Sequence, residues 1–167
     1  MTTRRRTGRH PVETDSGPKT AILYLRVSTP RQARKGGEPE GYSIPAQRGD
    51  CARKADGMDA TVVREFIEKG ESAKTADRTE LQAMLKYLSL VGKIDPETGE
   101  IVSRIDYVIV HSIDRLVRNR ADDVMIGIAL SRAGARLVSV KENIDETPTG
   151  QLIHGVMSSV AEFYSAT

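Results

Sequence analysis

Apolar residues along the chain form short continuous runs that alternate with segments of helical character from Lys19 onward. Runs of Val, Ile, Leu and Ala between polar loops are typical of strands that are buried on both faces. These runs predict strands at residues 20–27, 59–68, 105–112 and 135–142. Segments with helix-favouring residues or a helical apolar period, several ended by glycine, predict helices at residues 44–57, 79–92, 121–134 and 150–167.

The regular alternation of strands and helices predicts the fold class. Strand–helix–strand order is typical of an α/β domain, here with a mainly parallel central sheet of four to five strands and helices on both faces. Residues 93–104 predict a hairpin-type insertion that turns at the DPETG stretch. Ligands of such sheets bind at the carboxyl ends of the strands, so reactive residues are expected directly after strands.

The same patterns divide the chain into three regions. Residues 1–18 lack apolar periodicity and predict a disordered basic tail, whereas residues 19–149 contain all four predicted strands. From residue 150 a helix begins whose apolar stripe continues to the last residues without a stop signal, so we expect the start of a longer helix in a longer protein. The stripe consists of Ile153, Val156, Met157, Val160 and Phe163.

Composition limits the class of protein. The 167 residues, with 29% charged and 38% hydrophobic side chains, suit one soluble domain with its own core. The single cysteine, Cys51, excludes an internal disulfide and a multi-cysteine metal site, and it fits a reducing compartment. No apolar run approaches the roughly 20 residues of a membrane span. We therefore predict a cytoplasmic protein without membrane contact. The net charge of +2 alone says little about partners.

Polar residues that can carry chemistry follow three of the predicted strands. They are Arg26, Ser28 and Gln32 after the first, Ser72, Asp77 and Arg78 after the second, and Asp114, Arg115 and Arg118 after the third. A helix through the last segment would make Asp114 and Arg118 neighbours at i,i+4, a spacing that often reflects only an ion pair. Since the three segments meet at one sheet edge, they predict a single site rich in arginine.

Several familiar kinds of site do not match this set. A metal site is disfavoured because His and Cys are too few and the arginines would compete for the carboxylates. A Ser–His–Asp hydrolase is disfavoured because Ser28 lacks the G-x-S-x-G elbow and His111 is the only histidine nearby. The chain also has no GxxxxGK[ST] loop, which disfavours nucleotide hydrolysis.

Four arginines suit a phosphodiester. Guanidinium groups can hold its non-bridging oxygens through paired hydrogen bonds, and positioned cations stabilise the charge that develops during phosphoryl transfer. A serine in the same site is then a candidate nucleophile that forms a phosphoserine link. The positive field would favour its alkoxide, so no histidine base is required.

Four motifs, YLRVSTPRQ, SIPAQR, ESAKTADR and IDRLVRN, occur in this order within residues 20–164. Together they resemble the catalytic domain of serine recombinases, the resolvase/invertase family. The resemblance implies that Ser28 attacks DNA, becomes joined to a 5′-phosphate and frees a 3′-hydroxyl. It also implies roles for further residues: Arg26, Arg78, Arg115 and Arg118 bind the scissile phosphate, Asp77 and Asp114 orient arginines, and Tyr24, Gln32, Gln47 and Ser72 line the site.

The resemblance implies partners as well. They are double-stranded DNA and further copies of the chain, as a dimer that becomes a tetramer when active, in the cytoplasm of a bacterial host. Neither a metal nor a nucleotide cofactor is implied, and no small-molecule ligand. The long stretch between Ser28 and Gln47, the 92–104 insertion and the leader resemble large serine recombinases, the integrases of phages and mobile elements. In those proteins DNA-binding and zinc-containing domains follow the catalytic one.

Three alternatives stay open. A serine transposase with the same catalytic domain would use the same chemistry on other target sites. A flavodoxin-like anion-binding or signalling domain would need a Gly/Ser/Thr phosphate loop after the first strand, and STPRQ is a poor one. An interaction module that dimerises through residues 150–167 would explain the apolar stripe but not the arginines.

Overall fold

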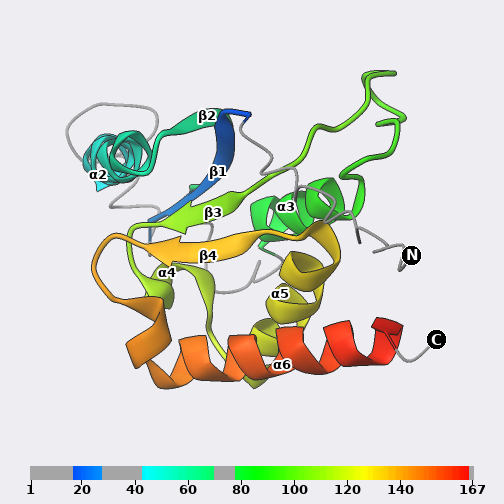
Figure 1. Cartoon of the computed structure of the whole chain (residues 1–167). Coiled ribbons are helices and arrows are strands. Elements are labelled where there is room, and N and C mark those ends of the chain that lie inside the picture. The colour runs from blue at the N-terminus through cyan, green and yellow to red at the C-terminus, as the bar shows by residue number, and fades with distance from the viewer. Residues whose placement is uncertain (1–16, 28–42, 70–77, 166–167) are drawn as a thin grey trace, which may run out of the picture.

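A parallel sheet lies at the centre of the molecule (Figure 1). The computed structural model describes residues 17–27, 43–69 and 78–165. Within them the 4-stranded sheet has the order β2-β1-β3-β4, and each neighbouring pair is parallel. The strands are β1 (Lys19–Arg26), β2 (Ala60–Glu68), β3 (Tyr107–Val110) and β4 (Arg136–Ser139). The predicted α/β class and the four predicted strands are thereby confirmed.

All four predicted helices are present. The helical elements are α2 (Ser43–Gly57), α3 (Thr79–Ser89), α4 (Ile113–Leu116), α5 (Arg120–Ala133), the 3-10 helix η1 (Ile144–Glu146) and α6 (Pro148–Ser165). Helix α3 ends before the predicted residue 92 because the chain pairs there with the returning arm of the insertion. Val91 forms a β-bridge with Val102, and the Gly92 backbone N–H donates to the Val102 carbonyl at 2.8 Å.

The two faces of the sheet carry separate apolar cores. Along β1, Ala21 and Leu23 face α2 and pack with its Cys51, whereas Ile22 and Tyr24 lie in the core on the opposite face. This alternation follows from the two-residue period of a strand. Figure 1 shows α2 on one side of the sheet and α3, α5 and α6 on the other, which is the predicted layer arrangement.

The insertion between α3 and β3 turns as predicted. The Asp95 backbone N–H donates to the Glu100 carbonyl at 2.8 Å, and the Gly99 N–H donates to the Asp95 carbonyl at 2.7 Å. Gly99 has a φ of 74°, a left-handed conformation that glycine adopts without steric cost. The DPETG stretch therefore closes a short hairpin-type turn.

Helix α6 packs on α5 through its first half and leaves its last turns exposed. A Cβ at Gly150 would lie 1.8 Å from the Ile144 carbonyl oxygen, so the start of α6 fits against η1 only with glycine there. Within α6, Ile153 is buried, whereas Phe163 and Tyr164 near the end of the helix are 67% and 54% exposed. None of the helices in the described part of the chain is long and apolar enough to cross a membrane.

Candidate active site

Four arginines from three separate segments converge at the carboxyl ends of β1 and β3. Arg26 is the last residue of β1, Arg78 is the N-cap of α3, Arg115 lies in α4, and Arg118 follows α4. Arg115 Nη1 donates to the Arg26 carbonyl at 3.3 Å. The chain leaves β1 for β2 on one side and returns as β3 on the other. The site therefore lies at the switch point where α/β sheets bind ligands.

The crowding of these cations shows in the ionisation of Arg26. Burial lowers the pKa of its guanidinium, and the nearby charges of Arg118, Arg78 and Arg115 lower that pKa further. Like charges that approach one another without compensation destabilise the charged form. Crowded cations of this kind favour the approach of an anion.

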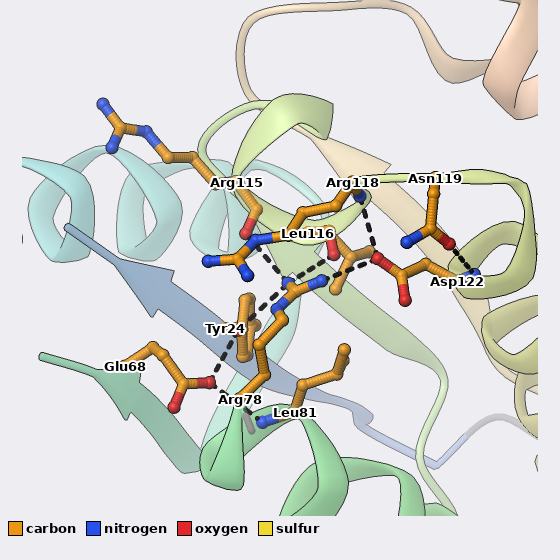
Figure 2. A network of polar contacts seen from close by, with 9 residues as sticks. All are labelled: Tyr24, Glu68, Arg78, Leu81, Arg115, Leu116, Arg118, Asn119 and Asp122. Carbon is orange, nitrogen blue, oxygen red and sulfur yellow. Dashed lines mark hydrogen bonds and ion pairs between the residues drawn. The ribbon is translucent and has the colours of Figure 1, made fainter. Parts of the chain in front are cut away.

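Arg78 is the buried centre of a polar network (Figure 2). Its Nη1 donates to Asp122 Oδ2 at 2.8 Å, and its Nη2 donates to Tyr24 Oη at 3.2 Å and to the Leu116 carbonyl. The Arg78 side chain is only 7% exposed. Its backbone is left-handed, with a φ of 41°, a conformation that is uncommon outside glycine. The guanidinium is consequently fixed from several sides, whereas the Arg115 side chain points away from the network (Figure 2).

Tyr24 connects Arg78 with the start of α3. Its hydroxyl donates to Glu68 Oε2 at 2.9 Å while it accepts from Arg78. Burial raises the pKa of the Tyr24 phenol, so the hydroxyl keeps its proton and remains a donor. The Glu68 carboxylate also accepts the backbone N–H groups of Glu80 and Leu81, each at 3.2 Å. Glu68 is not among the site residues predicted from the sequence. Its position at the carboxyl end of a predicted strand could have indicated it, because site residues are expected there.

Gln47 from α2 holds the backbone of Arg26. Its Nε2 donates to the Arg26 carbonyl at 3.0 Å, and its Oε1 accepts the Arg26 N–H at 3.3 Å. Gln47 is 3% exposed, so both ends of its amide are satisfied inside the protein. This pairing fixes the main chain at the point where β1 enters the site.

Asp114 and Arg118 do not lie on one helix, so the i,i+4 spacing considered for them does not apply. Helix α4 ends at Leu116, and Val117 is extended with φ −108° and ψ 130°. The chain turns there because Asn119 caps the next helix, its Oδ1 accepting the Asp122 N–H at 3.0 Å. Asp114 instead accepts a hydrogen bond from Ser112 Oγ, which holds the pKa of its carboxyl below the usual range, with a smaller contribution from Arg115.

Two buried donors lack an acceptor within the described part of the chain. They are Arg26 Nε and Arg78 Nε, one in each of two neighbouring guanidinium groups. A buried N–H without a partner is costly, and an anion with several acceptor oxygens is the kind of group that such donors favour. No group of three or more His, Cys, Asp or Glu side chains that could hold a metal occurs among the described residues.

Four of the predicted site residues and the tail at residues 1–16 lie outside the residues that the structure describes. The four are Ser28, Gln32, Ser72 and Asp77.

Comparison with known proteins gives consistent results. The family model "Resolvase, N terminal domain" matches residues 21–167. A putative DNA recombinase of Bacillus subtilis is 28% identical over 86% of this chain and 25% of its own length. The Transposon Tn21 resolvase of Escherichia coli is 33% identical over 87% of this chain and 62% of its own length. The chain therefore spans about a quarter and about three fifths of these two relatives.

Two solved structures share the fold. A resolvase family site-specific recombinase from Streptococcus pneumoniae has a TM-score of 0.57 and 25% identity, with 89% of each chain covered. The N-terminal catalytic domain of TP901-1 integrase has a TM-score of 0.56 and 23% identity, and the match covers 89% of this chain and 98% of that one.

Proposed function

Because the chain belongs to the family of resolvase N-terminal domains, we propose that it is the catalytic domain of a site-specific DNA recombinase. The observation that carries this proposal is the arginine cluster at the switch point of the sheet. It combines crowded guanidinium groups with two buried Nε donors that have no acceptor among the described residues. A DNA phosphodiester supplies the negative charge and the acceptor oxygens that such a cluster lacks.

The proposed reaction is a phosphoryl transfer. Ser28 Oγ attacks the phosphorus and forms a bond to the 5′-phosphate, the bond from phosphorus to the 3′-oxygen breaks, and the serine proton ends on the released 3′-hydroxyl. Arg26, Arg78, Arg115 and Arg118 hold the non-bridging oxygens, on which charge accumulates in the transition state. Because the phosphoserine bond conserves the energy of the broken bond, the reverse reaction can rejoin strands without a cofactor.

The remaining site residues have supporting roles in this proposal. Gln47 positions Arg26, and Tyr24 and Glu68 position Arg78, as their hydrogen bonds indicate. We assign contacts at the site to Gln32 and Ser72, and the orientation of arginines to Asp77 and Asp114, on the family resemblance of their motifs alone.

The proposed function also sets the assembly. Exchange between two DNA duplexes needs four strand cuts, so four copies of a site that makes one cut must act together. The exposed end of α6, with Phe163 and Tyr164, offers an apolar surface for joining copies of the chain. We propose a dimer that becomes a tetramer on DNA, acting on mobile DNA in the cytoplasm of a bacterial host as an integrase or as a transposase.

Trapping of a covalent protein–DNA adduct tests the proposal. The full-length protein is incubated with sheared host genomic DNA, the reaction is stopped with detergent, and DNA that stays attached to protein is recovered and sequenced. Mass spectrometry of the digested adduct should locate the phosphate on Ser28. The recovered duplex then becomes the substrate for variants.

The control variants are Ser28→Ala and Thr29→Ala. Ser28→Ala should form no adduct while it binds the recovered duplex as well as the wild type does, and Thr29→Ala should form the adduct normally. An adduct that persists in Ser28→Ala, or one that maps to Tyr24, would contradict the assignment.

A further inference from the structure

Asp122 connects two of the site arginines through a single oxygen atom. It lies in the first turn of α5 and is 8% exposed. Its Oδ2 accepts from Arg78 Nη1 at 2.8 Å and from the Arg118 backbone N–H at 2.9 Å (Figure 2). Its own backbone N–H donates to Asn119 Oδ1 at 3.0 Å. The carboxylate is therefore fixed by the helix start and in turn fixes two segments that follow different strands.

The two contacts have different consequences. The contact with Arg78 is a charge-assisted hydrogen bond between buried partners, and it keeps the guanidinium from turning away toward other acceptors. The contact with the Arg118 backbone fixes the chain where it leaves α4, and this sets the point from which the Arg118 side chain starts. Loss of the negative charge would loosen both arginines without removing either of them.

We propose that Asp122 is a positioning residue for DNA cleavage, which holds Arg78 and Arg118 in the geometry that the scissile phosphate requires. This role rests on the proposed function, since it concerns the same arginine cluster. Asp122 acts through the arginines and does not itself contact DNA, because a carboxylate beside a phosphate would repel it.

The neighbouring aspartate provides a matched control. Asp123 lies in the same turn of α5 and is 5% exposed, yet its Oδ1 has no hydrogen-bond partner within the described residues. None of the described hydrogen bonds or ion pairs joins its side chain to a site arginine. A change of aspartate to asparagine at either position removes the same charge from the same helix turn. Only the change at Asp122 removes the charged contact with Arg78.

The experiment measures single-turnover cleavage of the duplex recovered in the adduct assay, with the full-length protein in excess. Asp122→Asn should slow cleavage by roughly 10- to 100-fold, as expected when reacting groups are misplaced by about an ångström. Its dissociation constant for the duplex should stay within about threefold of the wild type, because phosphate contacts elsewhere are untouched. Asp123→Asn should cleave at the wild-type rate.

A double-mutant cycle separates positioning from general stability. In an Arg78→Ala background, Asp122→Asn should slow cleavage by a much smaller factor than in the wild type, because the guanidinium that it holds is gone. Equal factors in the two backgrounds would overturn the proposal, as would equal losses for Asp122→Asn and Asp123→Asn. If Asp122→Asn is unfolded at the assay temperature, Asp122→Glu replaces it. A folded Asp122→Glu protein should lose at least about tenfold in rate, and wild-type cleavage would overturn the proposal.

The result for the wild-type protein distinguishes a failure of the proposed function from a failure of the role of Asp122. If the wild-type protein forms no adduct with Ser28, both the proposed function and the role of Asp122 fail. If the wild type forms the adduct and Asp122→Asn forms it equally fast, only the role of Asp122 fails.

Discussion

Arginine and aspartate occur at both ends of the central strands, but their charges are arranged differently at the two ends. At the amino ends, Arg104 pairs with Asp106 at 2.8 Å, and the other oxygen of Asp106 accepts the Thr20 N–H at 2.9 Å. One cation and one anion neutralise each other there and fasten the beginnings of β1 and β3. At the carboxyl ends, four arginines crowd together, and Asp122 forms an ion pair with Arg78.

The difference indicates how a functional cluster can be told from a structural one. The amino-end pair is partly exposed, with 45% of the Arg104 side chain accessible, and its groups balance in charge. At the carboxyl ends, burial lowers the pKa of Arg26, and the nearby charges of Arg118, Arg78 and Arg115 lower that pKa further, although Asp122 compensates the charge of Arg78. Folding alone does not favour such an arrangement, so an anionic ligand is its physical explanation.

The largest expected effect is on the rate of DNA cleavage, and it comes from removing arginines at the carboxyl ends of the strands. Arg26→Ala, Arg115→Ala and Arg118→Ala should each slow DNA cleavage by about 10²–10³-fold, the usual cost of removing one donor to a developing charge. Lysine at these positions should recover little, because an ammonium cannot form the planar paired contact. Single-turnover cleavage of the recovered duplex measures these losses.

Arg104→Ala is the matched control at the amino ends. It should cleave at the wild-type rate and lose less than about 1 kcal/mol of unfolding free energy, as is usual for an exposed pair. A large loss of cleavage in Arg104→Ala, or normal cleavage in Arg118→Ala, would remove the distinction between the two ends.

Tyr24→Phe should have the next largest effect, on stability. The change removes one hydroxyl that bonds to both Glu68 and Arg78, and a hydrogen bond to a charged group contributes about 1.5–3 kcal/mol. We expect the free energy of unfolding to fall by about 2 kcal/mol. Cleavage should slow less than in any of the arginine variants. Denaturant titration measures the first quantity, and an unchanged midpoint would show that the network adds nothing to stability.

Asp106→Asn should affect stability alone. The asparagine can still accept from Thr20, but the charged contact with Arg104 is lost, so a decrease of about 1 kcal/mol in unfolding free energy is expected. The rate of DNA cleavage should be that of the wild type. Slower cleavage at full stability would mean that the amino ends also take part in the reaction.

The smallest effect is expected from Asp123→Asn, and it has the opposite sign. Burial raises the pKa of the Asp123 carboxyl, Arg120 lowers it, and Asp122 raises it again. A raised pKa in the folded state means that ionisation costs stability at every pH above the unfolded value of about 3.9. Asp123→Asn should therefore melt slightly above the wild type at pH 7. The gain should shrink as the pH falls through the raised pKa of the folded state toward about 4, and it should vanish below the unfolded value, where both states bind the proton. Melting curves across this pH range test the sign, and a lower melting temperature at pH 7 would contradict it.

Local patterns in the sequence determined the elements of this protein and the edge of the sheet where its chemistry lies. Runs such as that of β1 are buried on both faces in any parallel sheet. The carboxyl ends of parallel strands meet at one edge. The positions of Arg26 at the end of β1, and of Arg78 and Arg115 in the segments that follow β2 and β3, are therefore enough to group them. The family motifs that contain them carried the same information.

Tertiary structure decided which groups hold the arginines. Arg78 and Asp122 are 44 residues apart, and neither periodicity nor spacing predicts which carboxylate meets a given guanidinium. Asp114 and Arg118 are not helix neighbours, because α4 ends at Leu116 and Asn119 caps a new helix. Glu68 likewise joins Tyr24 to the start of α3 only because β1 and β2 lie side by side in the sheet. A side-chain pairing across elements depends on positions that the whole fold sets, whereas a strand or a helix is largely encoded in its own residues.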